Sequence, residues 1–146
     1  MSSAAFVPAA LAVLWAGISL GGSLIAAPAK FQAPSLSIPT ALEVGRAQFL
    51  WVGIGEALVC GLLIAALVFI PAPGPGFFTI PVILFALQRL VVMPVLDKRS
   101  LRVIEGGPVG PRSLHRVYIL LEVAKFLTLL GAAASSFANI LNGAGG

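Results

Sequence analysis

Four long apolar stretches, separated by short polar or proline-rich segments, constrain this chain more than any other feature. A helix rises ~1.5 Å per residue, so about twenty apolar residues cross the ~30 Å hydrocarbon core of a bilayer. The predicted membrane-spanning helices cover residues 6–27, 47–70, 77–96 and 114–141. Charged residues make up only 10% of the 146 residues, too few to coat a water-exposed surface, for which about 25% is usual. The sequence therefore predicts an all-α, four-helix transmembrane bundle that forms a single integral membrane domain over 1–146.

Proline and glycine mark the predicted connections between these helices. Three prolines in 28–39 predict a loop along the membrane interface. Thr40 and Glu43 then have the spacing of a capping box, which predicts Thr40 as the N-cap of the second helix. The uncharged segment 71–76 is expected to form a turn, and Pro94 is expected to kink or end the third helix.

Basic residues gather at one end of the predicted bundle. Four spans place both termini and the 71–76 turn on one side, which carries no Lys or Arg. The other side holds the loops 28–46 and 97–113 and the start of the fourth helix. Its seven basic residues are Lys30, Arg46, Lys98, Arg99, Arg102, Arg112 and Arg116. The positive-inside rule predicts cytoplasmic loops and periplasmic termini in a bacterial inner membrane.

The distribution of basic residues also indicates which kinds of binding partner to expect. The basic residues follow the predicted membrane boundaries instead of forming a basic stripe, so no nucleic-acid partner is expected despite the net charge of +4. The predicted partner is the lipid bilayer. A homo-oligomer or a partner protein in a membrane complex is left open.

Four charged side chains fall well inside the predicted spans. Glu56 lies in the second span, Arg89 in the third, and Glu122 and Lys125 one turn apart in the fourth. Charges at membrane depth are costly unless they are paired, so we expect a buried polar cluster. Arg89 is expected to pair with Glu56 or Glu122.

Two neutral polar side chains extend this candidate site. Gln88 is next to Arg89, and Tyr118 lies one turn before Glu122, to which it is expected to donate a hydrogen bond. Three interpretations of the cluster stay open. It fixes helix register through ion pairs, it lines a cavity for a proton, ion or small polar substrate, or Arg89 and Arg116 bind lipid headgroups.

The residues expected at the membrane interface are Arg46, His115 and Arg116. One histidine and one cysteine, Cys60, make a poor metal or haem site, so neither a metal nor another cofactor is expected. Cys60 is interpreted as a small packing residue. No catalytic set is recognised, and the chain is expected to be non-enzymatic, acting by binding, transport or scaffolding.

Small residues predict close helix packing in two places. In the first span they recur every four residues, as Ala12 and Ala16, Gly17 and Gly21, and Ser19 and Ser23. In the second span one face carries Gly45, Phe49, Gly53, Glu56 and Cys60. We expect another helix to approach this second face closely.

Short motifs along nearly the whole chain resemble a family of four-span membrane proteins of unknown function, which includes the animal cisplatin-resistance-associated transmembrane proteins. They are Leu14-Trp-Ala-Gly17, Ala27-Pro-Ala-Lys-Phe31, Gly45-x3-Phe49, Gln88-Arg-Leu-Val-Val-Met-Pro94 and Leu114-His-Arg-Val-Tyr118. This resemblance implies a four-span topology but no activity. Glu122 and Lys125 stand where that family usually has Asn-like and apolar residues.

A second resemblance implies an enzyme. Arg46-Ala47-Gln48 is similar to the start of the second-helix signature of the membrane-associated eicosanoid and glutathione metabolism family. Leu50 and Gly53 stand where that signature has Asn and Glu. The alternative function is therefore a glutathione transferase-like four-helix membrane enzyme.

Overall fold

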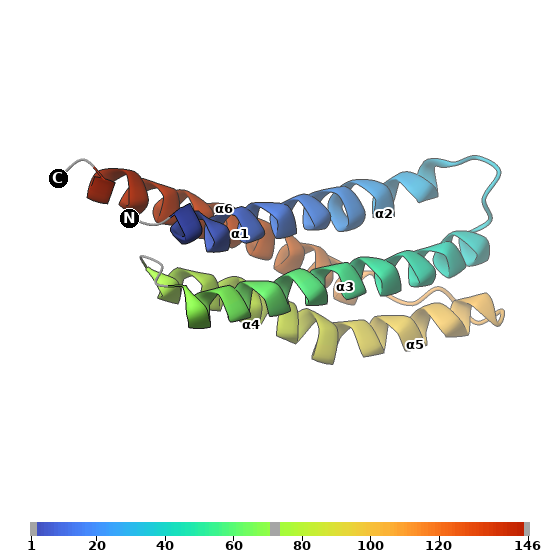
Figure 1. Cartoon of the computed structure of the whole chain (residues 1–146). Helices are drawn as coiled ribbons and strands as arrows, with labels where there is room; N and C mark the ends of the chain where they lie inside the picture. The colour runs from blue at the N-terminus through green and yellow to red at the C-terminus, as the bar shows by residue number, and fades with distance from the viewer. Residues whose placement is uncertain (1–2, 71–73, 145–146) are drawn as a thin grey trace.

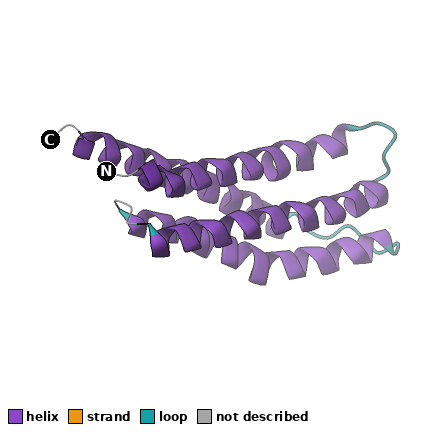
Figure 2. Cartoon of the chain, in the orientation of Figure 1, coloured by secondary structure: helices purple, strands orange, loops and turns teal. Residues whose placement is uncertain are grey.

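Four helical rods run antiparallel along one another in the computed structural model, which describes residues 3–70 and 74–144 (Figure 1). Within these residues the chain consists of helices and their connections (Figure 2). Each rod contains a segment long and apolar enough to cross a membrane: Val7–Gln32, Ile38–Phe69, Pro75–Ile104 and Ser113–Gly143. The predicted all-α four-helix bundle is confirmed, and the four rods support an integral membrane protein.

Two of the rods are continuous α-helices and two are composite. The first rod consists of η1 (Ser3–Phe6), α1 (Val7–Ile18), η2 (Ser19–Ala26), α2 (Ala27–Ala29) and η3 (Lys30–Gln32). The second is α3 (Ile38–Phe69). The third consists of η4 (Pro75–Phe78), α4 (Thr79–Leu87), η5 (Gln88–Val92) and α5 (Met93–Ile104). The fourth is α6 (Ser113–Ala144). The segments η2 and η5 are wound as π-helix.

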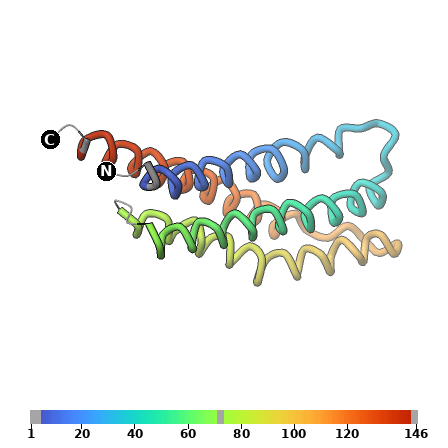
Figure 3. Tube along the Cα trace, viewed as in Figure 1, coloured from blue at the N-terminus to red at the C-terminus, as the bar shows by residue number. Residues whose placement is uncertain are grey.

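The two ends of the bundle differ in charge. The start of α1, the end of α6 and the segment η4 lie at one end, here called the terminal end (Figures 1 and 3). The connections 33–37 and 105–112 lie at the other, here called the basic end. This grouping of the ends is as predicted. Residues 71–73 of the predicted 71–76 turn lie outside the described residues, while Gly74 has a φ of 68°, a left-handed conformation that suits glycine.

Two prolines that were expected to interrupt helices do not end them. The first rod continues through Pro28 to Gln32, and the third continues through Pro94 to Ile104. A proline lacks an N–H, and its ring presses on the carbonyl one turn earlier. Each proline follows a π-helical segment by two residues, and the wider π turn gives its ring room.

The predicted N-cap of the second rod is also wrong. Ser37, not Thr40, precedes the first helical residue, and its hydroxyl accepts a hydrogen bond from the Thr40 N–H at 3.3 Å. Pro39 lies in the first turn, where its missing N–H leaves no intrahelical bond unmade. The helix can therefore begin three residues earlier than the capping box indicated.

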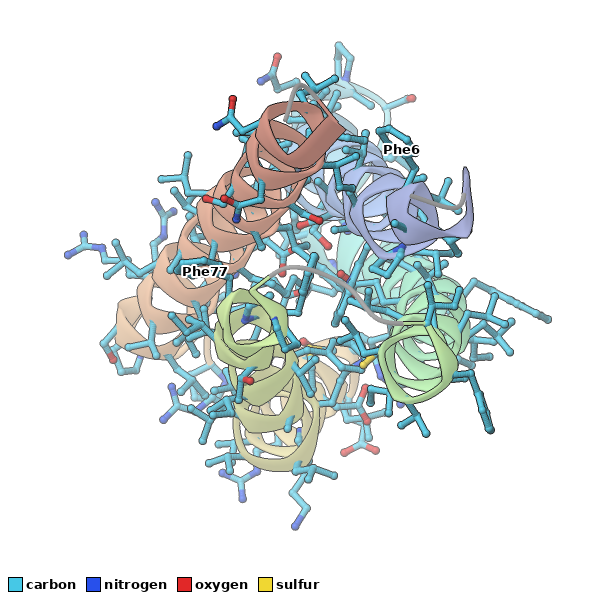
Figure 4. The ribbon with its side chains drawn as sticks, turned by 60° about the vertical axis from the view of Figure 1, so that its left-hand side comes forward. Phe6 and Phe77 are labelled. Atoms are coloured by element: carbon cyan, nitrogen blue, oxygen red, sulfur yellow. The ribbon has the colours of Figure 1, made fainter. Side chains whose placement is uncertain are left out.

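The apolar core lies toward the terminal end and contains many small residues. Its buried members are Ala9, Ala12, Trp15, Ala16, Val59, Cys60, Leu63, Phe78, Leu129, Ala132 and Ala133. Small side chains let helix backbones approach closely, which matters in lipid because apolar residues gain little by leaving it. Figure 4 shows side chains filling the space between the rods behind the end marked by Phe6 and Phe77. Of the small pairs of the first span, Gly17 and Gly21 face outward.

The predicted face of α3 is turned inward. Gly45, Gly53, Glu56 and Cys60 are buried, and Phe49 is partly buried. The two glycines make room for long cationic side chains. A Cβ at Gly45 would lie 2.5 Å from Lys30 Nζ, and one at Gly53 would lie 0.6 Å from Arg89 Nη2. The small residues of this face therefore accommodate a lysine and an arginine.

Candidate functional site

A buried ion-pair triad of Glu56, Glu122 and Lys125 lies between α3 and α6. The Lys125 ammonium donates to Glu56 Oε1 at 2.5 Å and to Glu122 Oε2 at 3.1 Å. The exposed fractions of the Glu56, Glu122 and Lys125 side chains are 3%, 0% and 0%. Because Lys125 and Glu122 are one turn apart on α6, the ammonium joins an acid of its own helix to an acid of α3.

The first rod supplies a hydrogen-bond donor to each acid. Trp15 Nε1 donates to Glu56 Oε1 at 3.1 Å. One turn later, the Ser19 hydroxyl donates to Glu122 Oε1. Both donors are fully buried. An α1 residue and an η2 residue thus fix the two carboxyl groups from the same side.

The third rod supplies the remaining donor through Gln88, the first residue of η5. Its Nε2 donates to Glu122 Oε2 at 2.7 Å and to the Tyr118 carbonyl at 3.4 Å. Gln88 is 1% exposed, and its Oε1 has no partner among the described residues. The two oxygens of Glu122 accept hydrogen bonds from Ser19, Gln88 and Lys125. Glu56 accepts from Trp15 and Lys125 in the described residues, and both of these donors bind its Oε1.

Aromatic rings cover the triad on the side of the terminal end. The Lys125 ammonium lies 5.4 Å from the centre of the Phe85 ring, a distance at which a cation is attracted to the ring face. Phe85 in turn packs edge-on against Trp15, with ring centres 5.3 Å apart. Trp15 belongs to the apolar core and Phe85 packs against it, so these rings join the charges to the core.

Arg89 does not pair with an acid, so the predicted pairing with Glu56 or Glu122 is wrong. Its Nη2 donates to the Phe49 carbonyl at 2.8 Å, over the space left by Gly53. Within residues 3–70 and 74–144 no acidic oxygen lies within 4.0 Å of its guanidinium. The cation that pairs with Glu56 and Glu122 is Lys125 instead of Arg89.

Tyr118 is buried beside the cluster, but its predicted hydrogen bond to Glu122 is not formed. Its hydroxyl lies 3.5 Å from the Ser23 hydroxyl, one turn beyond Ser19 on η2. Its ring packs edge-on against Phe49 at 5.3 Å. Tyr118 therefore continues the polar contacts from the triad toward the basic end.

The predicted interfacial residues lie outside the triad. Arg46 is partly exposed and forms a two-point ion pair with Asp97 of α5, with N–O distances of 2.6 and 3.1 Å. His115 and Arg116 are exposed on the first turn of α6. The structure thus brings together Glu56, Gln88, Glu122 and Lys125, and leaves the interfacial residues apart.

Sequence reasoning missed the contributions of Trp15, Ser19, Ser23 and Phe85. The first three follow one another at four-residue spacing, which places them on one helix face. That spacing is equally typical of small-residue packing, because a neutral side chain in lipid gives no clear sign of a buried partner. The indole N–H of Trp15, one turn before the serines, was the available sign that this face meets a buried acceptor.

Both π-helical segments contribute to the cluster. Ser19 and Ser23 lie in η2, and Gln88 and Arg89 lie in η5. Short π segments inside α-helices are frequent at functional sites. In the part of the chain that the structure describes, no three His, Cys, Asp or Glu side chains gather as metal ligands. What the site offers is a set of proton donors and acceptors around three charges.

No family model, curated protein or solved structure matches this chain.

Proposed function

We propose that this chain is a non-enzymatic membrane protein that binds a proton at the Glu56–Lys125–Glu122 triad. The observation that carries the proposal is the charge count of the triad. Two carboxylates share one ammonium, and the three side chains are at most 3% exposed. An uncompensated charge buried away from water carries an effective penalty of several kcal/mol. One added proton makes the triad neutral.

In the described residues, Lys125 is the one cation in contact with the two acids of the triad. Arg89 and Lys30 are the other cations whose side chains reach into the bundle. Arg89 is held by the Phe49 carbonyl, and Lys30 donates to Gln48 at 3.3 Å. Neither has an acidic oxygen within 4.0 Å in the described residues. The side chains of the first and third rods that donate hydrogen bonds to the triad are neutral. They are Trp15, Ser19 and Gln88.

Glu56 is the proposed proton acceptor. Three donors hold Glu122 in its charged form, one on Oε1 and two on Oε2. The described donors to Glu56 both use Oε1, so Oε2 is the carboxylate oxygen with the least stabilisation. Hydrogen bonds to a charged carboxylate favour that form, so the proton goes to the acid with fewer of them.

Polar side chains continue from the triad in the direction of the basic end, which supports one-sided access. Ser19 and Ser23 lead along η2 to the Tyr118 hydroxyl. In the other direction, the buried side chains of Leu63 and Leu129 belong to the apolar core. We therefore propose that the proton enters from the basic end and does not cross the bundle.

The test uses Trp15 as an internal reporter of Glu56. The chain has two tryptophans, so Trp51→Phe leaves Trp15 alone, hydrogen-bonded to the proposed acceptor. In lipid nanodiscs, the emission of Trp15 should change with pH while circular dichroism shows a folded bundle. Glu56→Gln should abolish the change, and the exposed acid Glu105 provides the matched control, Glu105→Gln. An emission that is constant with pH, or a change that survives Glu56→Gln, contradicts the proposal.

We also propose that the basic end faces the cytoplasm of a bacterial inner membrane. The seven basic residues of the connections and adjoining turns support this orientation. Alkaline phosphatase fused after Gly146 should be active in the periplasm, and a fluorescent protein fused there and exported should not fluoresce. The reverse pair of results would invert the orientation.

A further inference from the structure

A groove of about 500 Å³ lies between α3 and the η5–α5 part of the third rod, near the basic end. It is open to the surroundings and separate from the triad. Its walls combine apolar side chains with four charged ones, which are Glu43, Arg46, Arg89 and Asp97. A groove of mixed character at this level of a membrane bundle can receive a molecule that is itself charged at one end and apolar at the other.

Arg89 gives the groove an incompletely used cation. A guanidinium has five N–H donors in a planar fork, and the hydrogen bond recorded for Arg89 is the one from Nη2 to the Phe49 carbonyl. Arg46 is fixed nearby by its two-point pair with Asp97, made through Nε and Nη2. Arginine forks match the geometry of phosphate oxygens. Two arginines on one groove therefore favour a phosphate group as the ligand.

The order of charges along the groove distinguishes a zwitterion from an anion. Glu43 lies closest to the basic end, Arg46 follows one turn deeper, and Arg89 is held level with Phe49, six residues or ~9 Å beyond Glu43. The two arginines balance Glu43 and Asp97, so the groove is formally neutral. An anionic headgroup would bring a net charge into this neutral groove. A zwitterionic headgroup would place its phosphate beside the two arginines and its outer ammonium beside Glu43.

The surface beside Arg89 is suited to acyl chains. Leu50 on α3 is 59% exposed and Leu90 on η5 is 77% exposed, and both lie on the deeper side of Arg46. We propose that the α3–α5 groove binds a zwitterionic phospholipid whose headgroup carries a phosphate and an outer ammonium, for which phosphatidylethanolamine is the probe. Its phosphate lies between Arg46 and Arg89, its ammonium faces Glu43, and its acyl chains follow Leu50 into the bilayer.

The experiment measures the melting temperature of the full chain in detergent as lipids are added. A phosphatidylethanolamine should raise it more than a phosphatidylglycerol of the same acyl chains, and inorganic phosphate should leave it unchanged. Arg89→Leu should abolish the ethanolamine-lipid shift, whereas Arg99→Leu, an exposed arginine outside the groove, should retain it. Glu43→Gln should remove the difference between the two lipids.

Three results would overturn the proposal. They are an equal or larger shift with the glycerol lipid, an equal shift with inorganic phosphate, and an undiminished ethanolamine-lipid shift in Arg89→Leu. Should Arg89→Leu fail to fold, the exposed variant Glu43→Gln decides, because a lipid preference unchanged by that substitution also contradicts the assignment. The triad takes no part in this binding, so Glu56→Gln should show the parent's lipid response.

Discussion

Replacing Lys125 by methionine removes the one cation of the triad and leaves two buried carboxylates without it. At an effective dielectric constant of ~20, the two contacts of Lys125, at 2.5 and 3.1 Å, correspond to gross attractions of about 7 and about 5 kcal/mol. Desolvation of the three charges offsets much of this. Removing one partner of a buried pair costs ~3–5 kcal/mol in net stability.

This loss should appear as a lower melting temperature in detergent. For a chain of this length, ~2–4 °C per kcal/mol gives a decrease of about 10 °C. Lys98→Met, at an exposed lysine, is the matched control and should change little. The loss should be largest at high pH and shrink as pH falls, since carboxyl groups that gain protons no longer need the ammonium.

The two acids should differ in how well their neutralisation restores the bundle. Without Lys125, Glu122 keeps its donors Ser19 and Gln88, whereas Glu56 keeps Trp15 alone among the described residues. Lys125→Met with Glu56→Gln should therefore recover more of the melting temperature than Lys125→Met with Glu122→Gln. A single Lys125→Met variant that melts with the parent, or a greater recovery through Glu122→Gln, would refute the reasoning.

Three further predictions concern sites outside the triad. Gly53→Ala should cost about 1–3 kcal/mol, because its Cβ would lie 0.6 Å from Arg89 Nη2; Gly55→Ala, with open space around it, is the thermal-melting control, and equal losses would contradict the explanation. Arg46→Ala should lower the melting temperature much less than Lys125→Met does, because water screens its pair with Asp97, whose side chains are 34% and 41% exposed; a loss as large as that of Lys125→Met would count against this. Glutathione should not raise the melting temperature, because Arg89 occupies the space beside Gly53, where the enzyme signature has an acid; a clear increase would favour the transferase alternative.

The architecture could be predicted because hydrophobicity over twenty or more residues determines what can cross a bilayer. The gathering of Glu56, Glu122 and Lys125 followed from the same physics, since charges at membrane depth need partners. The choice between Arg89 and Lys125 as the paired cation could not be predicted. It depends on the rotation of the third rod, and a π turn adds a residue, which rotates the rest of the rod by ~100° relative to an α-helix.

The roles of Trp15 and Ser19 were out of reach for a different reason. A tryptophan or a serine in a membrane span is compatible with packing alone, and only the position of the acids on α3 and α6 gives either one a hydrogen-bond partner. The early start of α3 likewise depended on a local choice between Ser37 and Thr40 as the cap. Both hydroxyls could accept an N–H, and the geometry of Pro39 favours the earlier one.

The position of Glu56 along α3 makes the proposed proton site sensitive to the membrane potential. From Arg46 at the basic end to Phe69 at the terminal end there are 23 residues, ~35 Å, close to the thickness of the hydrocarbon layer. Glu56 is ten residues along this path, so a proton entering from the basic end crosses about 0.4 of the electric field.

A charge that crosses the whole field changes its energy by ~2.3 kcal/mol per 100 mV, so this proton changes by ~1 kcal/mol. With the basic end in a negative cytoplasm, the field opposes loading. Loss of a 100 mV potential would then raise the proton affinity of Glu56 about fivefold, with no change in pH on either side.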